Sequence, residues 1–164
     1  MTFLVSFFRF LFSGDKSFYF AIRHIVGFFP SNIKVYRLAF VHKSTAEQLK
    51  EGHINSNERL EFLGDAVLGL MVGDFLFRRF PYKDEGFLTQ SRSKIVNRGI
   101  LNELSQKMGL DALLQIEKTG SQDNRFIMGN AFEALVGAIY LDKGYDGVRN
   151  FILGKVLKEY IDVD

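Results

Sequence analysis

Apolar residues recur along most of this chain at the three- and four-residue spacing of helices, whereas the alternation typical of strands is scarce. Glycine, proline and clusters of small polar residues separate the periodic segments and indicate turns between them. The pattern therefore predicts an all-α fold. The helices are expected at about residues 3–12, 17–28, 33–40, 57–80, 87–97, 99–108, 111–117, 123–142 and 148–160.

Polar residues mark where two of these helices begin. The turn at residues 30–32 is expected to cap the helix that follows it, and Ser56 or Asn57 is expected to cap the first long helix. Pro81 should end that long helix, because a proline disfavours helical backbone in the residue before it.

Three carboxylates, Glu58, Glu61 and Asp65, interrupt the otherwise apolar first long helix. At about 100° per residue they fall on one stripe, which Gly69 shares. The other sides are apolar, so we expect this helix to be buried nearly all round except for one polar seam. The residues expected on those sides are Leu60, Leu63, Val67, Leu70 and Met71.

The second long helix carries a matching polar seam. Asn130 and Glu133 are three residues apart on one face, and Gly137 lies between them in angular position. Polar groups and a glycine again interrupt an apolar surface, so the two long helices are expected to pack closely with their seams meeting. Together the two seams would supply the polar residues Glu58, Glu61, Asp65, Asn130 and Glu133.

This inventory has two interpretations. Unpaired charges in an apolar helix cost several kcal/mol, and a bound cation would offset that cost. Oxygen ligands favour Mg²⁺ or Mn²⁺, which suit phosphodiester hydrolysis. The alternative is a structural ion-pair network with Arg59, Arg98 or Arg125. A redox di-iron centre is disfavoured, because the chain lacks the Glu-x-x-His pattern such centres use on facing helices.

Size and composition narrow the class of protein. A chain of 164 residues with 47% hydrophobic residues is expected to form one domain with a real core. It contains no cysteine, which excludes disulfides, thiolate metal sites and thiol nucleophiles, and it fits a reducing compartment. The net charge of +2 is too balanced to identify a nucleic-acid binder by itself.

The Phe-rich segment at residues 3–12 is the one membrane-like stretch. It is too short to span a bilayer and contains Arg9, and its apolar residues have the spacing of an amphipathic helix. We expect it to pack against the domain or a partner subunit, with interfacial membrane contact as the alternative. The predicted division is an N-terminal helical extension at 1–16 and a main domain at 17–164, with no stable membrane insertion.

Four sequence blocks occur in the order and spacing of one known family. NERLEFLGDAVLGL at 57–70 closely resembles the ribonuclease III signature, and LAFVHKS at 38–44 resembles the segment before it. DEGFLTQSRSKIVN at 84–97 and GNAFEALVGAIYLDKGY at 129–145 are similar to the later family blocks. The resemblance covers roughly residues 19–160.

This resemblance implies the helical endonuclease-domain fold of ribonuclease III, working as a cytoplasmic homodimer. Such an enzyme cuts both strands of double-stranded RNA, such as ribosomal RNA precursors and messenger RNA, and leaves 5′-phosphates and short 3′ overhangs. By motif position, Glu61, Asp65, Asn130 and Glu133 would bind catalytic Mg²⁺, for which Mn²⁺ can substitute. Asp65 and Glu133 are the catalytic candidates among them.

The resemblance also implies roles around the metal site. Glu58 and Glu85 match acidic positions that line the cleavage groove. Phe62 matches an aromatic residue that enters a socket on the partner subunit, and ordinary core filling is the alternative for it. An RNA duplex is gripped mainly through phosphates and 2′-hydroxyls, so basic residues beside the groove are candidate RNA contacts. These are His42, Lys43, Arg92, Lys94 and Arg98.

Two features depart from the family pattern. The family has Asp where this chain has Asn130, so the site loses one negative charge, although an amide oxygen can still bind a cation. We therefore expect weaker metal binding unless another residue compensates. A natural active variant, an introduced substitution that traps substrate, and a non-catalytic RNA-binding or ribosome-associated homologue are all open explanations.

The second departure is the end of the sequence at Asp164. Many family members continue into a separate double-stranded RNA-binding domain. This sequence is expected to be a shortened or a short form, with weaker and more salt-sensitive RNA binding.

Overall fold

The structure is a computed structural model of the whole chain. The predicted helix at 3–12 lies outside its described part, and the predicted domain division at residue 16 lies at the edge of that part. Both stay predictions. The described residues are 16–46, 55–116 and 124–160.

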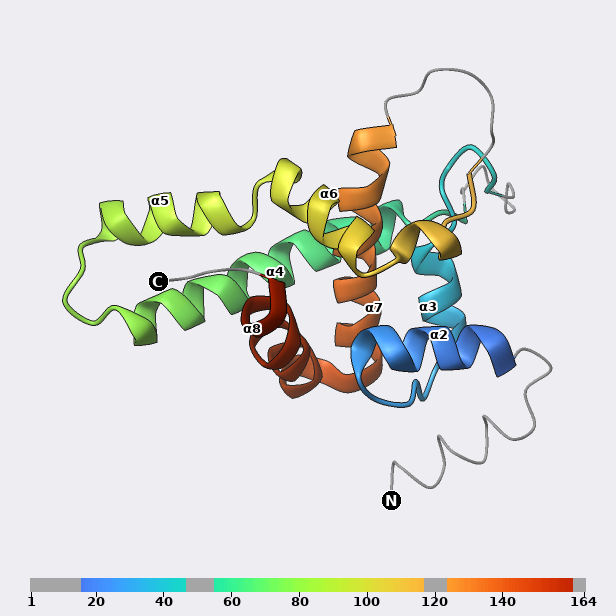
Figure 1. Cartoon of the computed structure of the whole chain (residues 1–164), viewed down its shortest axis with the longest axis horizontal. Coiled ribbons are helices and arrows are strands. Elements are labelled where there is room, and N and C mark those ends of the chain that lie inside the picture. Colours follow the sequence, from blue (N-terminus) through green and yellow to red (C-terminus); the bar gives the residue numbers. More distant parts are fainter. Residues whose placement is uncertain (1–15, 47–54, 117–123, 161–164) are drawn as a thin grey trace.

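The prediction of an all-α chain is confirmed (Figure 1). Within the described residues, the β pairing is limited to an isolated bridge between Val41 and Gln115. None of the helices in this part is long and apolar enough to cross a membrane. In chain order the elements are α2 (Lys16–Val26), α3 (Ile33–Ala39), α4 (Glu58–Arg79), α5 (Glu85–Ile95), α6 (Arg98–Lys107), the 3₁₀ turn η2 (Leu110–Leu113), α7 (Asn124–Phe151), the π-helical turn η3 (Ile152–Val156) and α8 (Leu157–Tyr160).

The helix predicted at 111–117 is wrong. Only the short turn η2 forms, and Gln115 then runs extended beside the segment that follows α3. Its backbone N–H donates to the carbonyl of Phe40 at 2.8 Å, and its carbonyl accepts from the N–H of His42 at 3.1 Å. Pairing with a distant backbone segment replaces the helix that local spacing favoured.

The break predicted after Asp142 is present inside α7. Gly144 has φ 66° and ψ −162°, so the backbone turns there between two helical stretches. A positive φ of this kind favours glycine, which has no Cβ to clash. The chain then turns back to complete the core with Phe151 and Ile152.

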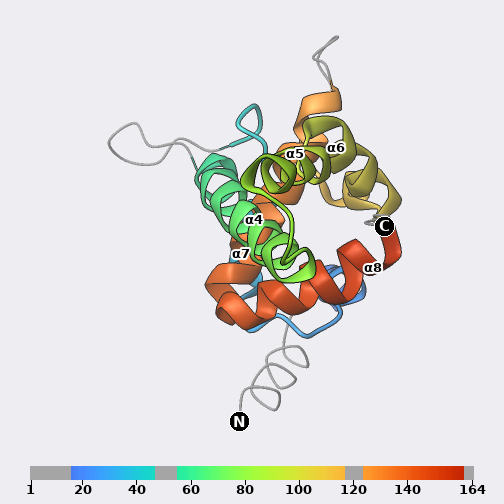
Figure 2. The same ribbon diagram turned by 90° about the vertical axis from the view of Figure 1, so that its left-hand side faces the viewer.

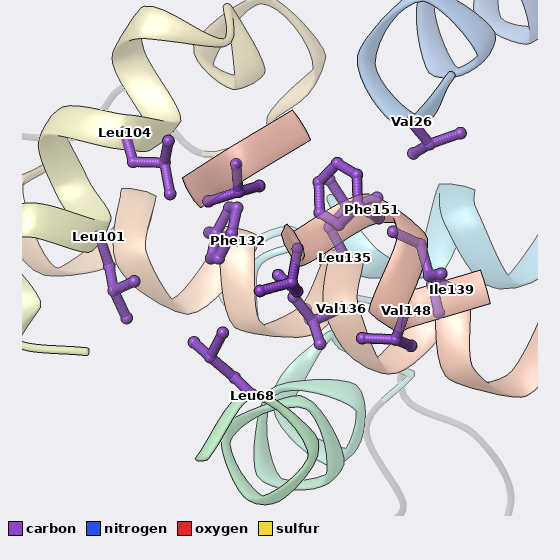
Figure 3. Close-up of a cluster of buried hydrophobic side chains, with 14 of the residues drawn as sticks. Val26, Leu68, Leu101, Leu104, Phe132, Leu135, Val136, Ile139, Val148 and Phe151 are labelled. Atoms are coloured by element: carbon purple, nitrogen blue, oxygen red, sulfur yellow. The ribbon is translucent and has the colours of Figure 1, made fainter. Parts of the chain in front are cut away.

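Helix α7 is the centre of the fold and contacts α3, α4 and α6 (Figures 1 and 2). Its apolar side chains meet those of α2, α4 and α6 in one cluster (Figure 3). Burial of these side chains is the main source of stability, at roughly 25 cal/mol per Å² of apolar surface. Members of the cluster include Val26, Leu68, Leu101, Leu104, Phe132, Leu135, Val136, Ile139, Val148 and Phe151.

The two long helices cross at glycines on both sides. A Cβ at Gly64 of α4 would collide with the backbone carbonyl of Glu133, and a Cβ at Gly137 of α7 would collide with that of Leu60. The predicted close packing at Gly137 is thus confirmed. The glycine on α4 was misidentified, because a Cβ at Gly69 would meet no atom within 4 Å.

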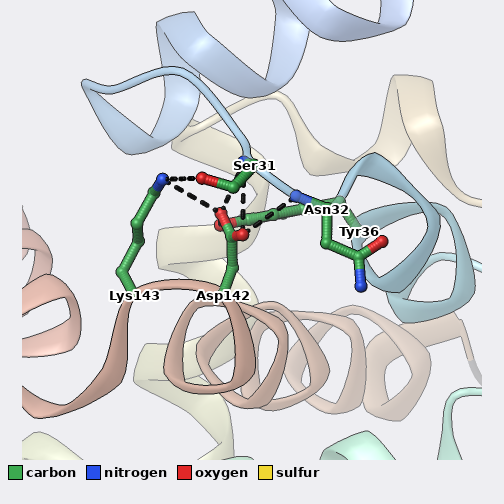
Figure 4. Close-up of polar contacts among 5 residues, drawn as sticks. All are labelled: Ser31, Asn32, Tyr36, Asp142 and Lys143. Atoms are coloured by element: carbon green, nitrogen blue, oxygen red, sulfur yellow. Dashed lines mark hydrogen bonds and ion pairs between the residues drawn. The ribbon is translucent and has the colours of Figure 1, made fainter. Parts of the chain in front are cut away.

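The start of α3 is held by a residue from the far end of α7 (Figure 4). The carboxylate of Asp142 accepts from the backbone N–H of Ser31 at 2.9 Å, from that of Asn32 at 2.9 Å and from the Tyr36 hydroxyl at 3.0 Å. The side chain of Asn32 makes no capping bond. Asn32 therefore occupies the predicted cap position, but the backbone of this turn is bonded by Asp142, through the N–H groups of Ser31 and Asn32 that precede the helix.

Candidate active site

The crossing of α4 and α7 brings together acids that are far apart in sequence. Gly64 lies between Glu61 and Asp65 in the chain, and its backbone packs against that of Glu133. Glu61 and Glu133 are half-buried, whereas Asp65 is exposed. The predicted meeting of the two polar seams therefore occurs at this crossing.

The charges of Asp65 and Glu61 act on the carboxyl of Glu133. Burial raises the pKa of Glu133 to about 7, and the charges of Asp65 and Glu61 raise it further, while Arg98 opposes them. Burial also raises the pKa of Glu61, followed by the charge of Glu58. Negative charge is thus concentrated where it is partly shielded from water, which favours a bound cation.

The carboxylate and amide oxygens of these residues are ligands that suit a hard divalent cation. Their side chains are not arranged around a common point in this structure. Among the described residues, no three His, Asp or Glu side chains are grouped closely enough to hold an ion. Asn130 is half-buried and lies one turn before Glu133 on α7. Four oxygen-bearing residues therefore flank the crossing, and side-chain rotation would be needed to bring them onto one ion.

Glu58 has a different environment at the first turn of α4. Its carboxylate lies 3.5 Å from Nζ of Lys43 and accepts from the Ser56 hydroxyl at 3.3 Å. The same hydroxyl accepts from the N–H of Glu58 at 3.4 Å, whereas the Asn57 side chain makes no capping bond. Of the two predicted caps, Ser56 is the one that bonds this helix end.

His42 and Lys43 form a basic edge beside these acids. Nδ1 of His42 lies 2.9 Å from the Ser44 hydroxyl. Burial lowers the pKa of His42, and the charge of Lys43 lowers it further, while Glu58 raises it. The backbone N–H of Asn57 donates to the carbonyl of Val41 at 2.9 Å, which ties this loop to the start of α4.

The alternative prediction, an ion-pair network of the acids with arginines, is met only in part among the described side chains. Glu58 pairs with Lys43 rather than with an arginine, and Arg59 is exposed. Arg98, the first residue of α6, is close enough for its charge to lower the pKa of both Glu61 and Glu133. Lys43 also lowers the pKa of Glu61, so these cations offset part of the repulsion, and the pKa of Glu133 remains raised despite Arg98.

The remaining candidate groove and RNA-contact residues of α5 lie at the two ends of this helix. Glu85 is exposed at its first turn, where its carboxylate accepts from the Thr89 hydroxyl at 2.8 Å. It follows the far end of α4, and a helix of 22 residues is about 33 Å long, so Glu85 lies remote from Glu61. Arg92 and Lys94 are exposed in the last turn of α5, at its junction with α6 (Figure 1).

Helix α4 also exposes an apolar stripe, contrary to the prediction of nearly all-round burial. Phe62 is 82% exposed, Leu70 56% and Phe77 71%. Core filling is therefore the wrong interpretation of Phe62, and Leu70 is wrongly expected to be buried. Phe62 and Leu70 are eight positions apart and Leu70 and Phe77 are seven apart, so the three residues share one side of the helix. We call Phe62, Leu70 and Phe77 the α4 stripe.

Comparison with known proteins identifies the family. A family model described as Ribonuclease-III-like matches residues 32–160. The chain belongs to the ribonuclease III family. Ribonuclease 3 of Bacteroides thetaiotaomicron is 47% identical over 156 residues, which cover 95% of this chain and 50% of that protein. Ribonuclease 3 of Flavobacterium psychrophilum is 44% identical over 152 residues, which cover 93% of this chain and 62% of that protein.

This ribonuclease III-like chain thus spans about half the length of its Bacteroides relative. Among solved structures it resembles the nuclease domain of ribonuclease III from Campylobacter jejuni, with a TM-score of 0.74 and 28% identity, over 88% of this chain and 97% of that one. A second structure of that domain, also with a TM-score of 0.74, concerns flexibility in a region involved in its dimer formation. The likeness confirms the predicted fold.

Two residues that shape the ribonuclease III-like site were not singled out from the sequence. Gly64 permits the close crossing, and the signal for it was a small residue placed between two acids of the seam. Asp142 fixes α3 on α7, and the signal for it was an acid near the C-terminal end of a helical stretch, where negative charge is unfavourable without a partner.

Proposed function

We propose that this chain is a metal-dependent endonuclease domain that hydrolyses phosphodiester bonds of double-stranded RNA. The observation that carries the proposal is the crossing at Gly64, where the backbone of α4 between Glu61 and Asp65 lies against Glu133, and burial and the charges of Asp65 and Glu61 raise the pKa of Glu133. Release of 5′-phosphates with short 3′ overhangs, action on precursors such as ribosomal RNA, and a cytoplasmic location rest on the family resemblance.

Glu61, Asp65, Asn130 and Glu133 are the residues that would hold Mg²⁺, with Mn²⁺ as a substitute. The ion would polarise the scissile phosphate and make a water molecule a better nucleophile. Asp65 is exposed and would hold the ion from the surface side of α4, whereas the half-buried Glu133 would hold it from α7. With its pKa about 7, the Glu133 carboxyl holds a proton in part of the molecules at neutral pH.

The basic residues suit a duplex that is gripped by its backbone. His42 and Lys43 lie at one end of the acidic seam, and Arg98 lies beside Glu61 and Glu133. Arg92 and Lys94 extend this basic surface along the end of α5. Contacts from such side chains to phosphates bind an RNA duplex with little dependence on base sequence.

A homodimer would cover the α4 stripe. Large apolar side chains exposed together on one side of a helix favour a protein partner. The dimer formation named for the Campylobacter jejuni domain supports a second copy of this chain as that partner. Because Glu85 is remote from the crossing in its own chain, it would line the same groove as Glu58 only through contact between two copies.

Asn130 supports a second candidate function, namely an RNA-binding homologue that does not cleave. An amide brings no charge to the site, and opposite charges about 4 Å apart attract by roughly 1 kcal/mol in water and by more when partly buried. Loss of that attraction weakens a metal site. The intact set of Glu61, Asp65 and Glu133 favours the active enzyme over this alternative.

Cleavage of a labelled RNA duplex in Mg²⁺ or Mn²⁺ separates the two candidates. The parent chain should cut, Glu133→Gln should not, and Asn130→Asp should cut at lower metal concentration. Glu103→Gln is the matched control, because it removes an exposed carboxyl of α6 that lies 2.7 Å from Nζ of Lys107 and is not among the candidate site residues. Binding without cleavage in the parent, with cutting gained only by Asn130→Asp, would favour the non-catalytic homologue.

A further inference from the structure

Two polar side chains of α6 bond to the backbone of α7 immediately before Asn130. The Asn102 side chain accepts from the N–H of Gly129 at 2.7 Å. The Ser105 hydroxyl lies 2.9 Å from the carbonyl oxygen of Met128 and 2.7 Å from that of Leu101, and donates to one of them at a time. A donor and an acceptor from α6 therefore meet the two sides of one peptide group of α7, the one that joins Met128 to Gly129.

These side chains lie on the packed side of α6. Ser105 is fully buried and Asn102 is half-buried, next to Leu101 and Leu104 of the apolar core. A polar group in such a place is unfavourable unless it is hydrogen-bonded. Both groups therefore favour one position of α6 against α7, whereas apolar contacts alone would tolerate sliding.

Gly129 provides the room for this contact. A Cβ at position 129 would lie 3.0 Å from Oδ1 of Asn102, which is tighter than ordinary van der Waals contact. Alanine here would therefore push the amide away from the N–H that it accepts from. Gly129 and Asn102 thus form a matched pair across the two helices.

We propose that Asn102 is a positioning residue for the metal site, with Ser105 as its support. The inference rests on the proposed function, in which Asn130 is a ligand. Asn130 directly follows Gly129. The bond between Asn102 and Gly129 therefore fixes the axial position and the rotation of α7 at the residue that carries the amide ligand. Displacement of a reacting group by about 1 Å can cost on the order of a hundredfold in rate.

The test compares Asn102→Ala, Gly129→Ala and the control Gln106→Ala in the full chain. Gln106→Ala removes an exposed amide from the same helix. Three readouts are needed: hydrogen exchange at the amides of Gly129 and Asn130, calorimetric binding of Mn²⁺ alone, and kcat with KM on an RNA duplex. Gly129→Ala is the second variant in case Asn102→Ala does not fold, since alanine favours helix over glycine.

Both test variants should speed exchange of the amide at position 129 about tenfold, relative to the intrinsic rate of the residue present there, as expected for loss of one hydrogen bond. They should also weaken Mn²⁺ binding and lower kcat by about tenfold, with KM for RNA nearly unchanged. Asn102→Asp retains an acceptor oxygen and should restore the slow exchange. Gln106→Ala should match the parent in all three readouts.

Unchanged exchange at Gly129 in Asn102→Ala would overturn the inference alone. Faster exchange with unchanged Mn²⁺ binding and kcat would also overturn it, because the bond would then serve stability only. If the parent chain neither binds Mn²⁺ nor cleaves, the proposed function fails, and the assignment of a positioning role fails with it.

Discussion

The backbone of Gly64 lies directly against the carbonyl group of Glu133, and no larger residue fits between them. A Cβ at position 64 would collide with that carbonyl and lie 2.9 Å from the backbone nitrogen of Gly137. Since both obstacles are helix backbone, α4 and α7 would have to move apart. We expect Gly64→Ala to lower the free energy of unfolding by about 3 kcal/mol or more, measured by urea denaturation.

Gly69→Ala is the matched control on the same helix. No atom lies within 4 Å of a Cβ placed there, so the helix preference of alanine should stabilise the chain by up to about 1 kcal/mol. The two variants should be compared in the same oligomeric state. Equal effects of both would contradict the close contact at Gly64.

Asp142→Asn should destabilise the chain by removing an acceptor that several groups share. The carboxylate accepts from two backbone N–H groups and the Tyr36 hydroxyl, and Nζ of Lys143 lies 3.5 Å from it (Figure 4). An amide keeps the shape but turns one acceptor into a donor. We expect a loss of about 2–4 kcal/mol in urea denaturation.

Tyr36→Phe provides the comparison, because it removes one of these bonds and leaves the carboxylate in place. Its expected cost is about 1–2 kcal/mol. If Tyr36→Phe cost as much as Asp142→Asn, the network would not be centred on Asp142.

Helical spacing was sufficient to predict which residues share a face. The acids at 58, 61 and 65 and the polar pair at 130 and 133 fell on the expected seams, and the two long helices do meet there. Spacing could not identify Gly64 as the contact glycine, because that depends on the crossing angle and axial offset of two helices. Neither is encoded within a single helix.

Two other features depended on contacts distant in sequence. The turn before α3 is held by Asp142, more than one hundred residues away, and local spacing does not identify which segment that acid bonds. Leu70 of the α4 stripe was expected to be buried, because an apolar residue that faces another chain has the same spacing as one that faces its own core. Sequence periodicity identifies an apolar side and leaves open which surface covers it.

Phe62→Asp should convert the proposed homodimer into a monomer. Phe62 is 82% exposed at the start of the α4 stripe, and a charge there would be buried without a partner when two copies meet. Sedimentation velocity at micromolar concentration should show a smaller species with unchanged helical content.

The control for this variant is Phe20→Asp on α2, which changes a phenylalanine that is 50% exposed and lies off α4. Phe20→Asp should leave the dimer intact. A parent chain that sediments as a monomer under the same conditions would contradict the homodimer.

Glu133 should make the metal-free chain less stable as the pH rises. Its pKa is raised from 4.5 to about 7 by burial and by the charges of Asp65 and Glu61, so the folded chain binds this proton more tightly than the unfolded chain. The stabilisation is fully present below about pH 4.5 and is lost as the pH rises through about 7. After allowance for solvent screening of a half-buried group, we expect an effect of about 1–2 kcal/mol.

Comparison of the parent chain with Glu133→Gln isolates this effect, because the shifted pKa values of Glu61 and His42 also influence stability. Thermal denaturation at pH 5.5 and pH 8 with a chelator present should show a smaller loss of stability for Glu133→Gln. Added Mg²⁺ should restore the parent chain at pH 8 by favouring the ionised carboxyls, and should do so less for the variant. Equal loss of stability in both proteins would show that Glu133 does not hold its proton unusually tightly. The acids at the crossing would then not repel one another as their placement indicates.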